Sequence, residues 1–260
     1  MTSAAGTVLS RREGAVAWLT LNRPEKRNAL NSEIISELKR ALVEAEDDDA
    51  SRVVALEGAG KDFCAGADLA AMERLLGASP IDNLADADGL GDLFLQLRRM
   101  RKPVVAIVRG RALAGGCGLA TACDLVLAAE SSSFGYPEVA IGFVPAMVMA
   151  MLRRNVGEKR AFELICLGKA ISAQEAERIG LVNQVHPDAE LAARAGATMA
   201  ELATRSPSAL QLCKRLLYQQ DGMAFESAVR AGAEANAIAR MTEDARAGIA
   251  RFTGDRSPEE

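Results

Sequence analysis

Two segments rich in small residues have the composition of loops that bind an anion through the backbone. One spans residues 63–69 (FCAGADL) and the other spans residues 110–120 (GRALAGGCGLA). Each follows an apolar run typical of a buried strand and leads into a helical pattern. Small residues let a ligand approach the backbone closely, and the start of a helix leaves N–H groups free. Two such turns facing one another would offer two N–H donors to one developing oxyanion, although either alone could be a tight strand-to-helix turn.

One acidic residue has apolar neighbours in the sequence. Glu138 lies within residues 134–142 (FGYPEVAIG), where Phe134, Val139 and Ile141 flank it. Such surroundings predict partial desolvation, which raises the pKa of a carboxyl group and suits it to general acid–base catalysis. From these residues alone, a surface glutamate that follows a turn is the preferred interpretation.

Two nucleotide-binding motifs are excluded at the segment Gly58 to Lys61. A phosphate-binding loop would need glycine in place of Ala55 and Ser or Thr in place of Asp62. A dinucleotide-binding GxGxxG motif would need glycine in place of Phe63.

The counts of histidine and cysteine argue against a metal site and a disulfide framework. His186 is the only histidine, so neither a histidine-based metal site nor a serine triad is supported. The cysteines are odd in number and irregularly spaced within apolar runs, which predicts reduced, buried thiols in a cytoplasmic protein. They are Cys64, Cys117, Cys123, Cys166 and Cys213.

Composition narrows the function classes further. The chain has 260 residues, of which 49% are hydrophobic and 25% charged, the balance of a globular protein. A net charge of −4 disfavours broad binding to nucleic acid or to an anionic membrane. No uncharged apolar stretch approaches the ~20 residues that span a bilayer, and the N-terminal segment lacks the apolar region of a secretory signal. We therefore expect a cytoplasmic protein that binds neither nucleic acid nor membrane.

The elements that position these loops read as an α/β fold. Buried strands are predicted at 16–21, 52–56, 104–108 and 125–128, and intervening helices predict parallel pairing with both sheet faces covered. Asn31 and Ser32 are predicted to cap a helix whose apolar positions recur at helical spacing. Those positions are Ile34, Ile35, Leu38, Leu42 and Val43. Residues 77–90, with Pro80 and several aspartates, are predicted to form a mobile loop.

The chain changes character after about Val185. Alanine-rich helices are predicted at 189–205, 208–219, 223–241 and 243–252. We therefore divide the chain into a flexible terminus (1–6), an α/β core (7–185) and a helical C-terminal region (186–260). No linker rich in Pro, Gly or Ser separates the last two, which predicts that they pack closely.

Several segments together resemble the enoyl-CoA hydratase/isomerase (crotonase) family. They are 58–69 (GAGKDFCAGADL), 110–128 (GRALAGGCGLATACDLVLA), 134–143 (FGYPEVAIGF), 21–31 (LNRPEKRNALN) and 177–185 (ERIGLVNQV). They occur in the family's order, and the resemblance covers about residues 7–256. It implies a core built as a spiral of ββα turns with a helical C-terminal trimerisation region, and hence a homotrimer or a dimer of trimers.

The resemblance also implies the site. The backbone N–H groups of Ala67 and Gly115 would form an oxyanion hole for a thioester carbonyl, and Glu138 would be the catalytic acid/base. The family's other catalytic carboxylate falls on Gly118, which cannot activate water. The substrate is an acyl-CoA, so coenzyme A arrives with the substrate and no separate cofactor is expected. The positions expected to contact the substrate are Lys26, Arg27, Ala29, Ala65, Asp68, Leu69, Gly116, Gly118, Pro137 and Phe252.

The reaction remains open at the level of sequence. A single carboxylate suffices for a Δ3-Δ2-enoyl-CoA isomerase, and residues 142–146 (GFVPA) resemble branched-chain, methylglutaconyl-type enoyl-CoA hydratases. The glycine at position 118 would leave room for a branched acyl chain. A catalytically weak acyl-CoA-binding protein is the alternative from another class, and an RNA-binding role is disfavoured by the acidic charge.

Overall fold

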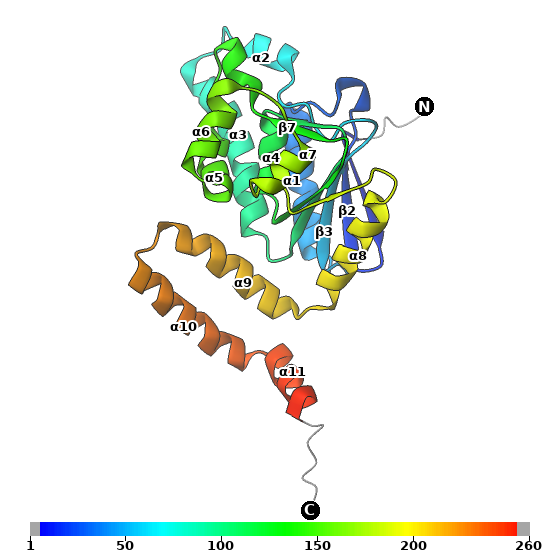
Figure 1. The fold of residues 1–260 in the computed structure, drawn as a ribbon, viewed down its shortest axis with the longest axis vertical. Helices are drawn as coiled ribbons and strands as arrows, with labels where there is room; N and C mark the ends of the chain where they lie inside the picture. Colours follow the sequence, from blue (N-terminus) through cyan, green and yellow to red (C-terminus); the bar gives the residue numbers. More distant parts are fainter. Residues whose placement is uncertain (1–5, 254–260) are drawn as a thin grey trace, which may run out of the picture.

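The computed structural model describes residues 6–253 and is built around a mainly parallel sheet (Figure 1). The strands lie in the order β1-β2-β3-β4-β6-β9, with only β1 and β2 antiparallel. Their bounds are β1 Val8–Glu13, β2 Val16–Leu21, β3 Val53–Gly58, β4 Val104–Val108, β6 Leu125–Ala129 and β9 Gln184–His186. The predicted α/β class and the predicted strands are thereby confirmed.

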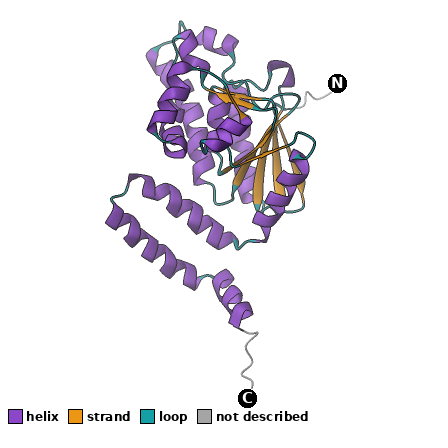
Figure 2. Cartoon of the chain, in the orientation of Figure 1, coloured by secondary structure: helices purple, strands orange, loops and turns teal. Residues whose placement is uncertain are grey.

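A second, smaller sheet lies beyond the carboxyl ends of the main strands. It contains β5 (Arg111–Leu113), β7 (Ser133–Gly135) and β8 (Ile171–Ser172), in that order. Figure 2 shows these short strands beside the main sheet, among the helices of the upper part of the molecule. Because β4 runs directly into β5 and β6 into β7, the chain turns from one sheet to the other twice, as in a spiral.

One face of the main sheet carries most of the helices and the larger hydrophobic core. These helices are α1 Ser32–Asp47, α3 Pro80–Arg99, α4 Gly115–Ala122, α5 Ala146–Val156, α6 Glu158–Leu167 and α7 Ala173–Arg178. Asn31 caps α1 as predicted, since its Oδ1 accepts the N–H of Ile34 at 3.0 Å. Val43 was expected to face the core but is 52% exposed, because the buried stripe of the helix passes through Leu42 and Ala45 on another face.

A single helix covers the opposite face. Helix α8 (Leu191–Thr204) packs Leu191, Ala195 and Met199 onto strands β3, β4 and β6. These side chains recur every four residues and so form one helical stripe. The apolar strand residues beneath it are Val53, Ala55, Val105, Ile107, Leu127 and Ala129.

The remaining helices form an arm that leaves the body of the molecule (Figure 1). They are α9 Pro207–Gln219, α10 Phe225–Met241 and α11 Glu243–Thr253, which confirms the predicted helices. Close packing of the whole C-terminal region was expected and is wrong, because α10 has no buried residue. The main contacts of α10 are with α9 and α11 and not with the body of the molecule. The division of the chain at residue 186 stays a prediction. Helix α8, which follows this division, packs on the main sheet.

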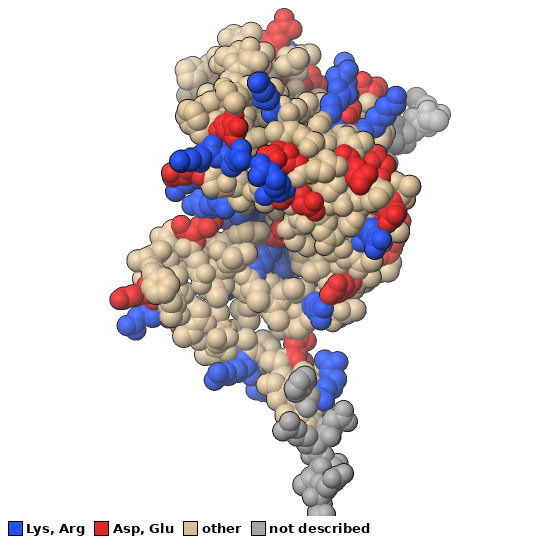
Figure 3. Space-filling view, viewed as in Figure 1, with Lys and Arg blue, Asp and Glu red and all other residues tan. Residues whose placement is uncertain are grey.

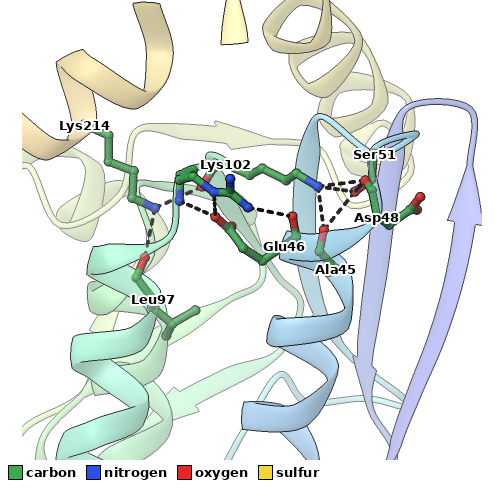
Figure 4. Close-up of polar contacts among 8 residues, drawn as sticks. Ala45, Glu46, Asp48, Ser51, Leu97, Lys102 and Lys214 are labelled. Atoms are coloured by element: carbon green, nitrogen blue, oxygen red, sulfur yellow. Dashed lines mark hydrogen bonds and ion pairs between the residues drawn. The ribbon is translucent and has the colours of Figure 1, made fainter. Parts of the chain in front are cut away.

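A buried lysine on α9 attaches the arm to the body. Figure 4 shows Lys214 reaching the end of α3 and the segment that follows it. Its Nζ donates to the carbonyls of Leu97 and Lys102 and pairs with Asp124 Oδ2 at 2.7 Å. Lys102 in turn donates to the Ala45 carbonyl at the end of α1. Lys214 thus joins the arm to a polar junction where α1, α3 and α9 meet.

The predicted mobile loop at residues 77–90 is wrong. Helix α3 begins at Pro80, with Ser79 as N-cap accepting the N–H of Asp82 at 3.2 Å. Proline at the first helical position is favoured because its missing N–H would be unpaired there anyway. The buried residues Leu93, Phe94 and Leu97 lie in the second half of the helix. The first half of α3 is weakly amphipathic, and the packing of the second half therefore stabilises the whole helix.

Two further expectations concern thiols and membranes. Cys64, Cys117 and Cys123 are buried free thiols as predicted, whereas Cys166 and Cys213 are exposed, because they lie on the outer faces of α6 and α9. Within residues 6–253 no helix has the length and apolarity needed to cross a bilayer.

Candidate active site

The two loops singled out in the sequence lie side by side. Cys64 pairs with Ala112 in an isolated parallel bridge between them. Leu113 donates its N–H to the Cys64 carbonyl at 3.0 Å, and Cys64 donates to the Arg111 carbonyl at 3.1 Å. These bonds hold residues 64–68 against the turn that starts α4. The predicted juxtaposition of the loops is present in the structure.

Glycine is required where the loops touch. Gly66 has φ +97°, and a Cβ there would lie 2.6 Å from the Ala114 Cβ. A Cβ on Gly116 would lie 2.3 Å from the Cys64 carbonyl oxygen, so this predicted substrate contact is a buried packing position. Ala114, just before α4, has φ 51°, a conformation that costs a residue with a Cβ of order 1 kcal/mol or more. The close approach of the loops therefore requires backbone strain at Ala114.

The N–H groups of Ala67 and Gly115 are free to bind a ligand. Within residues 6–253 neither donates a hydrogen bond, while the neighbouring Asp68 N–H donates to the Leu30 carbonyl at 2.8 Å. Gly115 is the first residue of α4, where a helix leaves its N–H groups unpaired and its dipole is positive. Both residues are at least partly exposed. Two donors in adjacent loops can stabilise an oxyanion of the kind predicted.

Glu138 carries an unpaired carboxylate oxygen. Glu138 lies in the 3-10 helix η2 (Pro137–Ile141), which follows β7. Strand β7 pairs with β5, which lies within the loop of residues 110–120. The Oε2 of Glu138 is buried with no hydrogen-bond partner among the described residues. Burial raises the pKa of Glu138 above its ordinary value. A raised pKa suits a carboxyl group to general acid–base catalysis.

The surroundings of Glu138 differ from those expected. Phe134 is buried, but Val139 and Ile141 are exposed and therefore do not desolvate the carboxylate. The 3-10 helix turns them outward, whereas the sequence pattern suggested a continuous apolar environment. Burial raises the pKa of the Cys117 thiol on α4, and the nearby charge of Glu138 adds to this effect.

Gly118 does not leave the space that was expected of it. It is buried in α4, and a Cβ there would lie 3.1 Å from both Phe94 Cζ and Val148 Cγ2. Room for a branched acyl chain beside Glu138 was therefore a wrong inference, because side chains from α3 and α5 already fill it. Its φ lies outside the left-handed region, so packing and not backbone strain opposes a side chain.

Four polar residues that sequence reasoning did not single out hold the first loop: Asn28, Asp62, Arg111 and Arg23. Asn28 is fully buried and donates to the carbonyls of Ala59 and Asp62 at 2.9 and 2.8 Å. Asp62 forms a bidentate pair with Arg111, which fixes the first loop to β5 and lowers the pKa of the Asp62 carboxyl. Arg23 pairs with Asp68 at 2.9 Å. The polar residues within 21–31 and 58–69 were the available signal.

The predicted substrate contacts differ in their placement. Lys26, Arg27 and Leu69 are exposed, Ala65 and Pro137 are partly exposed, and Ala29 is buried. The Asp68 carboxylate is occupied by Arg23 and by the N–H groups of Ala70 and Ala71, as the N-cap of α2 (Leu69–Leu75). Phe252 lies in α11, but its side chain falls outside the described residues, as does Arg256. Among residues 6–253 no cluster of metal-ligating side chains occurs.

The fold and these paired loops define the crotonase class of protein. Comparison with known families agrees, since the family model described as enoyl-CoA hydratase/isomerase matches residues 11–259. The chain therefore belongs to the enoyl-CoA hydratase/isomerase family and is an enzyme acting on acyl-CoA.

Individual relatives match along nearly their whole length. A protein of Thermus thermophilus named "Putative enoyl-CoA hydratase" is 44% identical over 246 residues, 95% of this chain and 97% of the relative. The 2,3-dehydroadipyl-CoA hydratase of Escherichia coli is 36% identical over 250 residues, 95% of this chain and 96% of the relative. The crystal structure of an enoyl-CoA hydratase from Mycobacterium smegmatis superposes with a TM-score of 0.91 at 32% identity, covering 98% of this chain and 99% of that one.

Proposed function

We propose that this enzyme adds water to 2-enoyl-CoA thioesters, with Glu138 as its single acid/base. The observation that carries the proposal is the buried, unpaired Oε2 of Glu138 beside two loops with free N–H groups. The N–H groups of Ala67 and Gly115 would bind the thioester carbonyl oxygen. Preorganised donors of this kind contribute about 10²–10³ in rate each.

One carboxylate can serve both proton transfers. The Glu138 carboxylate takes a proton from water as the water oxygen bonds to C3 of the 2-enoyl thioester. The electron pair of the double bond moves onto the carbonyl oxygen, which the two N–H donors hold as an enolate. The protonated Glu138 then returns the proton to C2, so that water adds across the double bond and the carboxylate is regenerated. A raised pKa favours this cycle because both forms of the acid are accessible.

Double-bond migration between 3-enoyl-CoA and 2-enoyl-CoA is the second candidate. Gly118 supplies no second carboxylate to hold a water, and Phe94 and Val148 occupy its surroundings. Isomerisation needs no water, since one base removes a proton from C2 and returns it to C4. A branched-chain, methylglutaconyl-type hydratase or a catalytically weak binding protein are the further alternatives, which substrate assays separate.

The experiment compares wild type with Glu138→Gln on matched 2-enoyl-CoA and 3-enoyl-CoA substrates, followed by absorbance and mass. Water addition should dominate with the 2-enoyl substrate, and the variant should lose about 10²–10⁴ in turnover while retaining its fold. Product of unchanged mass from the 3-enoyl substrate, with no hydration, would establish the second candidate. Turnover of the variant within a few-fold of wild type would remove Glu138 from the mechanism.

We also propose that the enzyme assembles as a homotrimer or a dimer of trimers in the cytoplasm. Support for assembly comes from α10, whose apolar residues Phe225, Val229 and Met241 are exposed. Support for the compartment comes from the free thiols, which include exposed Cys166 and Cys213.

A further inference from the structure

A groove with a cavity of about 610 Å³ runs between the body and α9. Helices α3 and α5 form one wall and α9 forms the other. The end nearest α4 is apolar, lined by Phe94, Met147 and Met151. Figure 3 shows Lys and Arg atoms in the hollow between the body and the arm. The groove thus changes from apolar to cationic along its length.

Helix α3 runs from the neighbourhood of Gly115 to the cationic end of the groove. Leu90, Phe94 and Arg98 are four residues apart and share one face of the helix. Leu90 Cδ2 lies 3.6 Å from where a Cβ on Gly115 would be, and Phe94 Cζ lies 3.1 Å from the corresponding point on Gly118. Arg98 follows one turn later, roughly 12 Å along the helix axis from Leu90 at 1.5 Å per residue. An acyl chain whose carbonyl is held at Gly115 and which follows α3 would end near Arg98.

The charges around the groove are unbalanced. Five arginines and one aspartate line it: Arg98, Arg99, Arg101, Arg154, Arg215 and Asp221. Arg154 pairs with Asp221 at 2.8 Å, and Arg101 pairs with Glu46 at 2.6 Å. The other three arginines make no ion pair with a described residue. An anion is the ligand that this imbalance favours.

Arg98 lines the groove and is held in place by stacking. Its guanidinium stacks on the ring of Tyr218 at 4.2 Å from the centroid. The Tyr218 hydroxyl donates to Asp124 Oδ1 at 2.7 Å, and Lys214 pairs with the other oxygen, so the stacking surface is itself fixed. The Nε of Arg98 is buried with no hydrogen-bond partner among the described residues. Stacking leaves the N–H edge of a guanidinium open, and that edge matches a carboxylate with two parallel hydrogen bonds.

We propose that this groove binds the distal end of the acyl chain and that Arg98 selects acyl-CoA substrates whose far end is a carboxylate. The proposal rests on the acyl-CoA function proposed above and adds the substrate class. The apolar residues of α3 and α5 would contact the methylene chain, and Arg98 would pair with the terminal carboxylate. Arg98 is then a specificity residue that takes no part in the proton transfers.

The test is a binding experiment that does not depend on turnover. Calorimetry compares saturated thioesters of equal length that end in methyl or carboxylate: hexanoyl-CoA against adipoyl-CoA, octanoyl-CoA against suberoyl-CoA, and decanoyl-CoA against sebacoyl-CoA. At one or more lengths the carboxylate-ended ligand should bind at least about tenfold more tightly, the scale of one charge-assisted hydrogen bond. Arg98→Gln should abolish this preference and leave the Kd of the methyl-ended ligand unchanged.

Two matched variants complete the design. Arg98→Lys keeps the charge and the aliphatic stem but loses the planar fork, so it should retain only part of the preference and guards against misfolding of Arg98→Gln. Arg153→Gln removes an exposed arginine of α5 that does not line the groove, and it should retain the full preference.

Several results would overturn the proposal. The proposal is wrong if no chain length shows a carboxylate preference, or if the preference survives in Arg98→Gln. It is also wrong if Arg98→Gln lowers the affinity for both ligands equally, or lowers the affinity for free coenzyme A. Hydration of 2-enoyl-CoA is measured in parallel. Hydration without the binding preference removes only this inference, whereas the binding preference without hydration removes only the proposed reaction.

Discussion

The raised pKa of Glu138 implies a cost in stability beside the catalytic role proposed for it. Its carboxyl is half-buried and its pKa is raised, so the folded protein holds that proton more tightly than the unfolded chain does. Stability from this group is therefore present at low pH and is lost as pH rises through the raised pKa. The proposed proton transfer would account for an acid at this position in spite of the cost.

Replacing Glu138 with Gln should therefore increase thermal stability at neutral pH while it reduces turnover. The neutral amide avoids burying a charge, so Tm should rise by up to about 2–4 °C, the shift that 1 kcal/mol produces in a chain of this size. The gain should shrink below the raised pKa, where the wild-type carboxyl is already protonated. Calorimetric scans of both proteins across pH 4–8 check this, and a gain that grows with acidity would contradict it.

Gly118 is the residue at which packing decides what a substitution does. Gly118→Glu would restore the family's second carboxylate, but its Cβ would press on Phe94 and Val148. We expect a loss of stability of about 1–3 kcal/mol from overpacking. Adding Val148→Ala should recover part of it, with Val148→Ala alone as the control in a double-mutant cycle. Denaturant unfolding measures the coupling, and additive effects would show that the two residues do not compete for space.

A gain in hydration from the second carboxylate is expected only in the relieved double variant, because only there can the glutamate side chain enter without displacing α3 or α5.

At the scale of elements, the start of α4 and the first loop act as one unit. Gly66→Ala would place a Cβ against Ala114 and force apart the loops that carry Ala67 and Gly115. Displacing one oxyanion donor should lower kcat by about 10²–10³. Gly14→Ala is the matched control, since Gly14 also has positive φ (58°) but has nothing within 4 Å of the new Cβ. Steady-state kinetics of both variants decide this, and equal losses of activity would show that backbone strain, not loop contact, is responsible.

The attachment of α9 is a second feature at this scale. Lys214 and Asp124 form an ion pair with side chains only 8% and 16% exposed. Lys214→Met leaves the Asp124 carboxylate without its charge partner, which typically costs about 3–5 kcal/mol for a buried pair. Limited proteolysis should then cleave between α8 and α9 faster than in wild type. The control is Arg205→Gln, which breaks an exposed pair with Glu201 in the same region. Equal cleavage of the two variants would argue against the attachment.

At the scale of the whole molecule, the arm leaves apolar side chains uncovered. Phe225 and Met241 on α10 are 83% and 72% exposed. We expect light scattering at micromolar concentration to give the mass of a trimer or a hexamer, because assembly buries such surfaces. The double variant Phe225→Ser with Met241→Ser should shift the mass toward the monomer, whereas Arg194→Gln on α8 should not. A monomeric wild type would contradict the proposal.

The sequence by itself determined four strands of the main sheet, the helix that begins at residue 32, the C-terminal helices and the identity of the two loops. Apolar strand runs, the cap at Asn31 and the glycines of 63–69 and 110–120 are local signals that need no knowledge of distant neighbours. The catalytic glutamate and its partners came from motifs of the family, which also lie within short stretches of chain.

Only the tertiary structure decided what long-range packing controls. Residues 80–90 form the first turns of α3 and not a loop, because α3 docks through Leu93, Phe94 and Leu97. The space beside Gly118 is filled by residues from α3 and α5, and Asn28 holds carbonyls more than thirty positions away. Arg98 meets Tyr218 across 120 residues of sequence. Such contacts join side chains whose separation along the chain carries no information about their separation in space.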